Sequence, residues 1–169
     1  MKINALRVSA IATALMIVWL RIQGATLITT TSPRGIVDLE LADSSDRLME
    51  LMTAWNKSVA SNNILIDFLF IPAYASLIAL CCRYLSEKFP DTRLPLIGMQ
   101  LAKAIWLAAL LDVVENLLML CSLNGFYSPT SLQLTCWIAT IKFLLVGLAL
   151  LYILILFFKL ILKKILNGA

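Results

Sequence analysis

Four long apolar runs constrain this chain more than any other feature of its sequence. Each has at least the roughly 20 residues that a helix needs to cross a bilayer. The runs are apolar in blocks and not along one amphipathic stripe, which is typical of membrane spans. Composition agrees, because 61% of the residues are hydrophobic and 14% are charged, whereas soluble domains are about half apolar and about a quarter charged. The predicted spans cover residues 5–29, 64–84, 97–123 and 136–158.

These spans predict an all-α, integral membrane four-helix bundle. Residues 1–169 would form a single transmembrane domain, with residues 30–63 as its outer loop. The first span has a competing interpretation as a cleaved signal peptide, because Lys2 and Arg7 precede an apolar stretch. Arg21 interrupts the end of that stretch, so a retained span is favoured.

Basic residues near the span ends predict the orientation of the bundle. Cytoplasmic loops of membrane proteins carry an excess of Lys and Arg. The outer loop contains Arg34, Arg47 and Lys57, and the loop SLNGFYSPTSLQLT before the fourth span carries no charge. We therefore expect a bacterial inner membrane protein with both termini in the cytoplasm, and its net charge of +4 indicates membrane anchoring and no nucleic-acid partner. The larger basic group lies at the opposite ends: Lys2, Arg7, Arg83, Lys88, Arg93, Lys159, Lys163 and Lys164.

The sequence excludes most familiar enzyme classes. It contains no histidine, which rules out His-ligated metal centres and Ser-His or Cys-His nucleophile pairs. It also lacks a P-loop, a GxGxxG motif and a CxxC motif. We therefore predict neither a metal site nor a cofactor.

A short amphipathic helix is predicted within the outer loop, in the stretch DSSDRLMELMTAWN. Ser44 or Ser45 would cap it, with Asp46 in its first turn. We expect it to rest at the membrane–water interface on the outer side, or to cover the bundle. Upstream, IVDLELA alternates apolar and acidic residues over a stretch too short to assign. The apolar face of the predicted helix consists of Leu48, Leu51, Met52 and Trp55.

Polar residues inside the spans point to a shared site. Asp112, Glu115 and Asn116 stand at i, i+3 and i+4 and so project from one helix face. A charge at the bilayer centre costs about 2.5 to 3.5 kcal/mol, so this face should turn into the bundle. The other spans offer partners at similar depth in the outer half, with two cations against three acids. Such a gathering of buried ionisable groups is a candidate functional site. The predicted ligand-binding set is Arg21, Asp67, Tyr74, Asp112, Glu115, Asn116 and Lys142.

A purely structural interpretation stays open, in which buried polar contacts hold the helices in one arrangement. Arg21 and Lys142 are also long enough to snorkel towards water and leave the cluster, and Lys142, nearer its boundary, should escape more easily. Cys121 and Cys136 lie at the outer ends of their spans. There they would form a disulfide on an oxidising exterior, or remain as buried free thiols.

One pattern of short motifs resembles small four-span bacterial membrane proteins of unassigned function, and the resemblance covers nearly the whole chain. It implies no activity. A looser similarity is to the sterol-isomerase-like four-span fold, in which acidic residues inside the bundle act on a lipidic ligand. That family's motifs are not matched residue by residue, and fold analogy says little about function. The motifs are Trp55, Asp67-Phe68, Tyr74, Asp112-Val113-Val114-Glu115-Asn116 and Lys142-Phe143.

These observations lead to three functional hypotheses. The first is binding, moving or sensing of an amphiphilic, lipid-like ligand, with membrane lipids as partners. The second is an intramembrane acid–base enzyme, an isomerase or a lipid-modifying enzyme, with Asp112 and Glu115 as the catalytic pair. The third is an assembly subunit whose charges pair with another membrane protein or a second copy. Cavity shape separates the first two: a closed pocket with both carboxyls aimed at one point favours chemistry, and an open groove favours binding.

Overall fold

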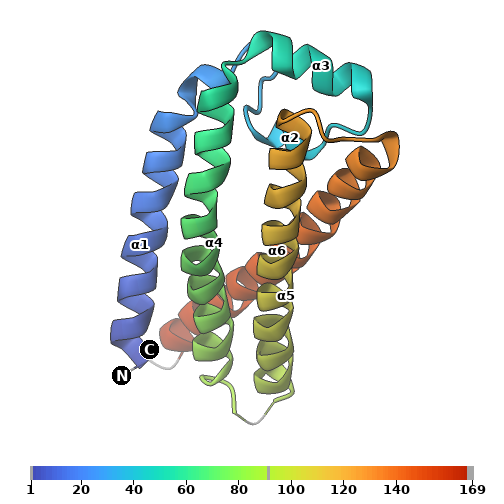
Figure 1. Ribbon diagram of the computed structural model, residues 1–169. Helices are drawn as coiled ribbons and strands as arrows, with labels where there is room; N and C mark the ends of the chain where they lie inside the picture. Colours follow the sequence, from blue (N-terminus) through green and yellow to red (C-terminus); the bar gives the residue numbers. More distant parts are fainter. Residues whose placement is uncertain (1, 91, 167–169) are drawn as a thin grey trace.

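Four long helices dominate the computed structural model, which describes residues 2–90 and 92–166 (Figure 1). Each of the four is long and apolar enough to cross a membrane. The predicted all-α four-helix fold is therefore confirmed, and the chain is an integral membrane protein. The long helices are α1 (Lys2–Gln23), α4 (Lys57–Ser86), α5 (Leu94–Leu123) and α6 (Pro129–Leu166).

The helix boundaries differ from the predicted spans at both ends of the bundle, since α6 continues past residue 158 to Leu166. α1 stops at Gln23 and is followed by the 3-10 turn η1 (Ala25–Leu27), so the first span is shorter than predicted. α4 begins earlier, because the side chain of Asn56 caps it by accepting a hydrogen bond from the N–H of Ser58 at 2.9 Å. α6 also begins earlier, at Pro129, since proline at the first helical position has no N–H that needs a partner.

α4 and α5 form the centre of the bundle, and α1 lies at its edge. α1 packs mainly against α4, whereas α5 packs against both α4 and α6. α6 crosses obliquely behind α4 and α5, and its last turns lie at the same end of the molecule as the start of α1 (Figure 1). The outward side of α1 exposes large apolar residues such as Val8, Leu15 and Val18, which is the surface that lipid would cover.

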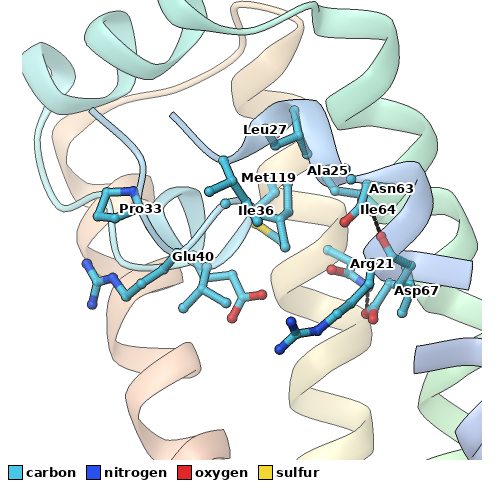
Figure 2. A pocket seen from close by; sticks show the side chains of 17 residues that line it. Arg21, Ala25, Leu27, Pro33, Ile36, Glu40, Asn63, Ile64, Asp67 and Met119 are labelled. Atoms are coloured by element: carbon cyan, nitrogen blue, oxygen red, sulfur yellow. Dashed lines mark hydrogen bonds between the residues drawn. The ribbon is translucent and has the colours of Figure 1, made fainter. Parts of the chain in front are cut away.

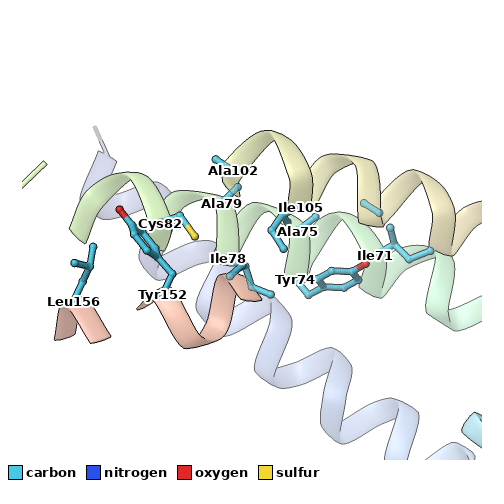
Figure 3. Close-up of a cluster of buried hydrophobic side chains, with 12 residues drawn as sticks. Ile71, Tyr74, Ala75, Ile78, Ala79, Cys82, Ala102, Ile105, Tyr152 and Leu156 are labelled. Atoms are coloured by element: carbon cyan, nitrogen blue, oxygen red, sulfur yellow. The ribbon is translucent and has the colours of Figure 1, made fainter. Parts of the chain in front are cut away.

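The half of the bundle away from residues 24–56 has an apolar core of small and branched residues (Figure 3). Gly98 allows α5 to approach α4 here, because an added Cβ would lie 2.7 Å from the carbonyl oxygen of Cys82. The Tyr152 hydroxyl donates a hydrogen bond to the carbonyl oxygen of Leu94 at 2.7 Å, which ties α6 to the start of α5. The core includes Ile71, Ala75, Ile78, Ala79, Ala102, Ile105, Ala109 and Leu156.

The segment between α1 and α4, residues 24–56 and here called the outer segment, covers the opposite end of the bundle (Figure 1). It contains α2 (Val37–Glu40) and α3 (Ser45–Ala54). α3 is the predicted amphipathic helix, and Ser44 is its cap, accepting a hydrogen bond from the N–H of Arg47 at 3.4 Å. The helix covers the bundle, because its apolar face packs in the same buried cluster as residues of α5 and α6.

Candidate functional site

The polar face predicted for the third span is turned into the bundle. Asp112, Glu115 and Asn116 are 5%, 0% and 2% exposed, whereas Leu110 and Leu117 on the same helix are more than half exposed. α5 therefore turns its leucines outward and its polar groups inward, as lipid requires.

Lys142 of α6 is the centre of a buried ion network. Its ammonium donates hydrogen bonds to Glu40 Oε2 at 3.2 Å, to Asp112 Oδ1 at 2.9 Å and to Glu115 Oε1 at 3.0 Å. A lysine ammonium has three N–H donors, so all of them are used. Because the three carboxyl groups come from α2 and α5, Lys142 joins α6 to both of these elements.

The two carboxyl groups from α5 differ in how fully they are bonded. Asp112 has both oxygens engaged, because its Oδ2 accepts a hydrogen bond from the hydroxyl of Tyr74 on α4 at 2.8 Å. Glu115 Oε2 lies 2.9 Å from Lys142 Nζ, yet among the described residues it has no hydrogen-bond partner of suitable geometry. We call these five residues, Glu40, Tyr74, Asp112, Glu115 and Lys142, the ion network.

Asp67 and Asn116 form a second, smaller polar group. The side-chain N–H of Asn116 donates to Asp67 Oδ2 at 2.7 Å, which joins α5 to α4 one turn away from Asp112. The structure thus brings the predicted polar residues of α4, α5 and α6 into two neighbouring groups in one half of the bundle.

A partly open pocket of about 490 Å³ lies at this level, lined by residues of α1, α4, α5 and the outer segment (Figure 2). Its volume falls within the range of about 300–1,000 Å³ that is usual for small-molecule sites. Apolar side chains such as Leu20, Ile64 and Met119 form much of its wall. Its polar lining consists of Arg21, Arg34, Glu40, Asn63, Asp67 and Asn116.

Glu40 connects the pocket to the ion network. It lines the pocket (Figure 2), and its Oε2 accepts the hydrogen bond from Lys142. Sequence analysis missed this residue, because it lies in the unassigned stretch IVDLELA and 102 positions before its partner. The available signal was that Glu40 lies between two leucines, Leu39 and Leu41. Apolar residues on both sides indicate that this part of the loop is buried.

The structure corrects the placement of Arg21. The sequence predicts this residue within the charged cluster, but it is exposed at the end of α1, and no described residue forms an ion pair or hydrogen bond with its guanidinium. The reason is that α1 packs at the edge of the bundle, whereas α6 packs directly on α5. The sequence also predicts that Lys142 leaves the cluster more easily than Arg21. The opposite holds, since Lys142 is buried in the ion network and Arg21 lies outside it, at the pocket.

A separate ion cluster fastens the outer segment. Asp38 accepts hydrogen bonds from the backbone N–H of Arg34 at 2.8 Å and from its guanidinium at 3.0 and 2.7 Å. The guanidinium of Arg47 lies 3.5 Å from Asp38 Oδ1 and forms a second ion pair. Burial by itself raises the pKa of Asp38, but the hydrogen bonds and charge of Arg34, assisted by Arg47, outweigh burial and lower this pKa below its ordinary value. Asp38 is therefore ionised at neutral pH and holds the turn that leads into α2.

The cysteines at the outer helix ends match neither predicted arrangement. Cys121 and Cys136 are free thiols, with Cys121 exposed and Cys136 half-buried. The two sulfur atoms are not bonded to each other, and Cys121 is not packed in the core.

No family model matches this chain, and no curated protein or solved structure shows significant similarity to it. The resemblance to small four-span bacterial membrane proteins stays a prediction. Function is therefore argued from the chemistry of the site.

The site contains more carboxyl groups than cations. Three carboxyl groups of the ion network share the ammonium of Lys142, and Asp67 is bonded to the neutral amide of Asn116. Unbalanced charge in a dry interior is costly. The pocket lined by Glu40 and Asp67 offers room for a ligand that brings a positive charge to these carboxyl groups.

Proposed function

We propose that this protein binds an amphiphilic, lipid-like molecule in the pocket between α1, α4, α5 and the outer segment. We place it in the bacterial inner membrane with both termini in the cytoplasm. The orientation is supported by the basic residues that flank the inner ends of the helices, such as Arg83, Lys88 and Lys159. It puts the pocket in the outer half of the membrane.

The observation that carries this proposal is the mixed lining of the pocket. Apolar residues of three helices form one part of the wall. Another part is formed by the carboxyl groups of Glu40 and Asp67 and by the guanidinium of Arg21, which has no partner among the described residues. A molecule with an apolar tail and a charged head matches both parts. Movement or sensing would follow from Glu40, because a ligand that contacts this carboxyl group also perturbs its hydrogen bond to Lys142.

An intramembrane acid–base enzyme is less well supported. Asp112 and Glu115 both point to Lys142, and neither belongs to the described residues that line the pocket. A general acid or base must come within hydrogen-bond reach of the substrate. The arrangement therefore favours binding over catalysis by this pair.

Photocrosslinking of the purified full chain tests the proposal. A diacyl phospholipid with a diazirine near its head group should label residues of the pocket wall, including Leu20, Ile28 and Met119, in a saturable manner. Arg21→Gln and Asp67→Asn should each reduce this labelling several-fold. Arg7→Gln is the matched control, because Arg7 is an exposed arginine on the same helix but lies far from the pocket.

Two outcomes would contradict the proposal. The first is even labelling of all lipid-facing surfaces, without saturation, in both the native chain and Asp67→Asn. The second is loss of a larger complex in Arg21→Gln with no change in lipid labelling, which would favour the assembly-subunit hypothesis instead.

A further inference from the structure

We infer that the pocket selects an amphiphile whose head group carries a primary ammonium beside a phosphate, as in an ethanolamine phospholipid. This inference rests on the proposed function and names the head group that the site would recognise. It follows from the hydrogen-bonding capacity, the charge and the composition of the pocket lining.

The pocket lining contains several side-chain oxygen atoms that accept no hydrogen bond from the described residues. In Asp67, Oδ2 is taken by Asn116, and in Glu40, Oε2 is taken by Lys142. The amide of Asn63 is oriented by its N–H donation to the carbonyl oxygen of Leu20 at 3.1 Å and to Gln23 Oε1 at 2.7 Å. No described residue donates a hydrogen bond to the other carboxyl oxygen of Glu40 or Asp67, or to the one amide oxygen of Asn63 or Asn116.

A primary ammonium complements this set of acceptors. It supplies three N–H donors and one positive charge, which would lie against the carboxyl groups of Glu40 and Asp67 while the phosphate lies elsewhere in the pocket. A quaternary ammonium such as choline has no donor and is usually recognised by aromatic rings. None of the described residues lining the pocket is Phe, Tyr or Trp. The lining therefore favours an ethanolamine over a choline head group.

Arg21 provides the complementary site for the phosphate. Its guanidinium has no ion-pair partner among the described residues, while Arg34, the other arginine of the lining, is bound to Asp38. Guanidinium groups bind phosphate through two parallel hydrogen bonds. Arg21, Glu40 and Asp67 line the same pocket (Figure 2), so one head group would meet charges of both signs there.

A series of head groups with successive N-methyl groups tests this inference. Phospholipids with ethanolamine, monomethyl-, dimethyl- and trimethyl-ammonium heads and identical acyl chains compete with the diazirine probe for the purified full chain. The net charge stays the same while one N–H donor is lost at each step. The ethanolamine lipid should compete at least about tenfold better than the choline lipid, a difference of about 1.4 kcal/mol. The intermediate heads should fall in order between them.

Two variants test recognition of the ammonium and of the phosphate separately. Asp67→Asn should reduce the ethanolamine-to-choline preference to less than about threefold. Arg21→Gln, an exposed residue whose change should not disturb the fold, should weaken all phospholipids alike and preserve their ranking. Should Asp67→Asn fail to fold, the methylation series and Arg21→Gln still decide the matter.

The possible results are distinguishable. Equal competition by all four heads, with saturable labelling of the pocket, would overturn the head-group inference and leave the proposed function standing. Absence of saturable pocket labelling by any phospholipid would overturn both. Displacement of the probe by soluble glycerophosphoethanolamine at the same concentration would support the ammonium but contradict a membrane amphiphile as its source.

Discussion

The ion network and the pocket lie next to each other but differ in how many of their polar groups have hydrogen-bond partners. In the ion network every donor of Lys142 has a carboxyl partner. In the pocket, Arg21 has no partner within the described chain and several oxygens accept nothing. Asp112 and Asn116 stand one turn apart on α5 and are both buried, yet of the two only Asn116 lines the pocket. Polar residues of one helix face thus serve different roles, and their bonding, not their position in the sequence, distinguishes the roles.

Lys142→Met should give the largest effect, because it leaves three carboxyl groups without their cation in a dry interior. Removing one partner of a buried ion pair typically costs about 3–5 kcal/mol. Unfolding of the detergent-solubilised protein by denaturant measures this loss. Lys103→Met is the control, since Lys103 is exposed on α5. Equal small losses in both variants would show that the ion network does not stabilise the bundle.

Adding Glu115→Gln to Lys142→Met should recover part of the lost stability. This change removes one uncompensated carboxyl group, and residues in direct contact are expected to be non-additive. A double-mutant cycle in the same unfolding assay measures the coupling. Strict additivity of the two changes would contradict the contact between Lys142 and Glu115.

Glu40→Gln should have an intermediate effect, because it weakens the link between the pocket and the ion network. A hydrogen bond to a charged group contributes about 1.5–3 kcal/mol. Hydrogen exchange of residues 33–42 should accelerate with it. Glu50→Gln is the matched control, since Glu50 pairs with Arg47 on the surface and is 48% exposed, where an ion pair contributes about 0–1 kcal/mol. If Glu40→Gln leaves exchange unchanged, the pocket and the network are independent.

Tyr74→Phe should cost about 1 kcal/mol, because Asp112 Oδ2 loses its hydrogen bond. Tyr84→Phe is the comparison, as Tyr84 packs against Lys88 and its hydroxyl donates to no described residue. Thermal unfolding of both variants measures the difference.

The smallest expected effect is a pH dependence of the outer segment. The folded pKa of Asp38 is below its ordinary value, so its ion pairs stabilise the fold above the unfolded pKa. That contribution is lost as the pH falls through the folded pKa. Asp38→Asn should therefore flatten the acid side of the stability profile, with little change in slope above pH 6. Parallel profiles of the native chain and Asp38→Asn below pH 5 would count against this role.

The features that follow from local spacing were predictable from the sequence. Hydrophobic run length identified the four membrane helices, because the bilayer sets the length of a span. The i, i+3, i+4 spacing of Asp112, Glu115 and Asn116 placed all three on one inward face. Ser44 and the apolar positions Leu48 and Leu51 likewise identified the helix of the outer segment.

Tertiary structure decided which of these polar groups meet. The pairing of Lys142 with Glu40 joins residues 102 positions apart, and no local pattern relates a single-turn helix in a loop to a lysine in the last span. The edge position of α1, which packs mainly on α4, kept Arg21 out of the ion network around Lys142. Local chemistry determined which side chains lipid would reject, since that depends on each residue alone. Their partners depend on how whole helices and the outer segment pack, and only the folded molecule specifies that.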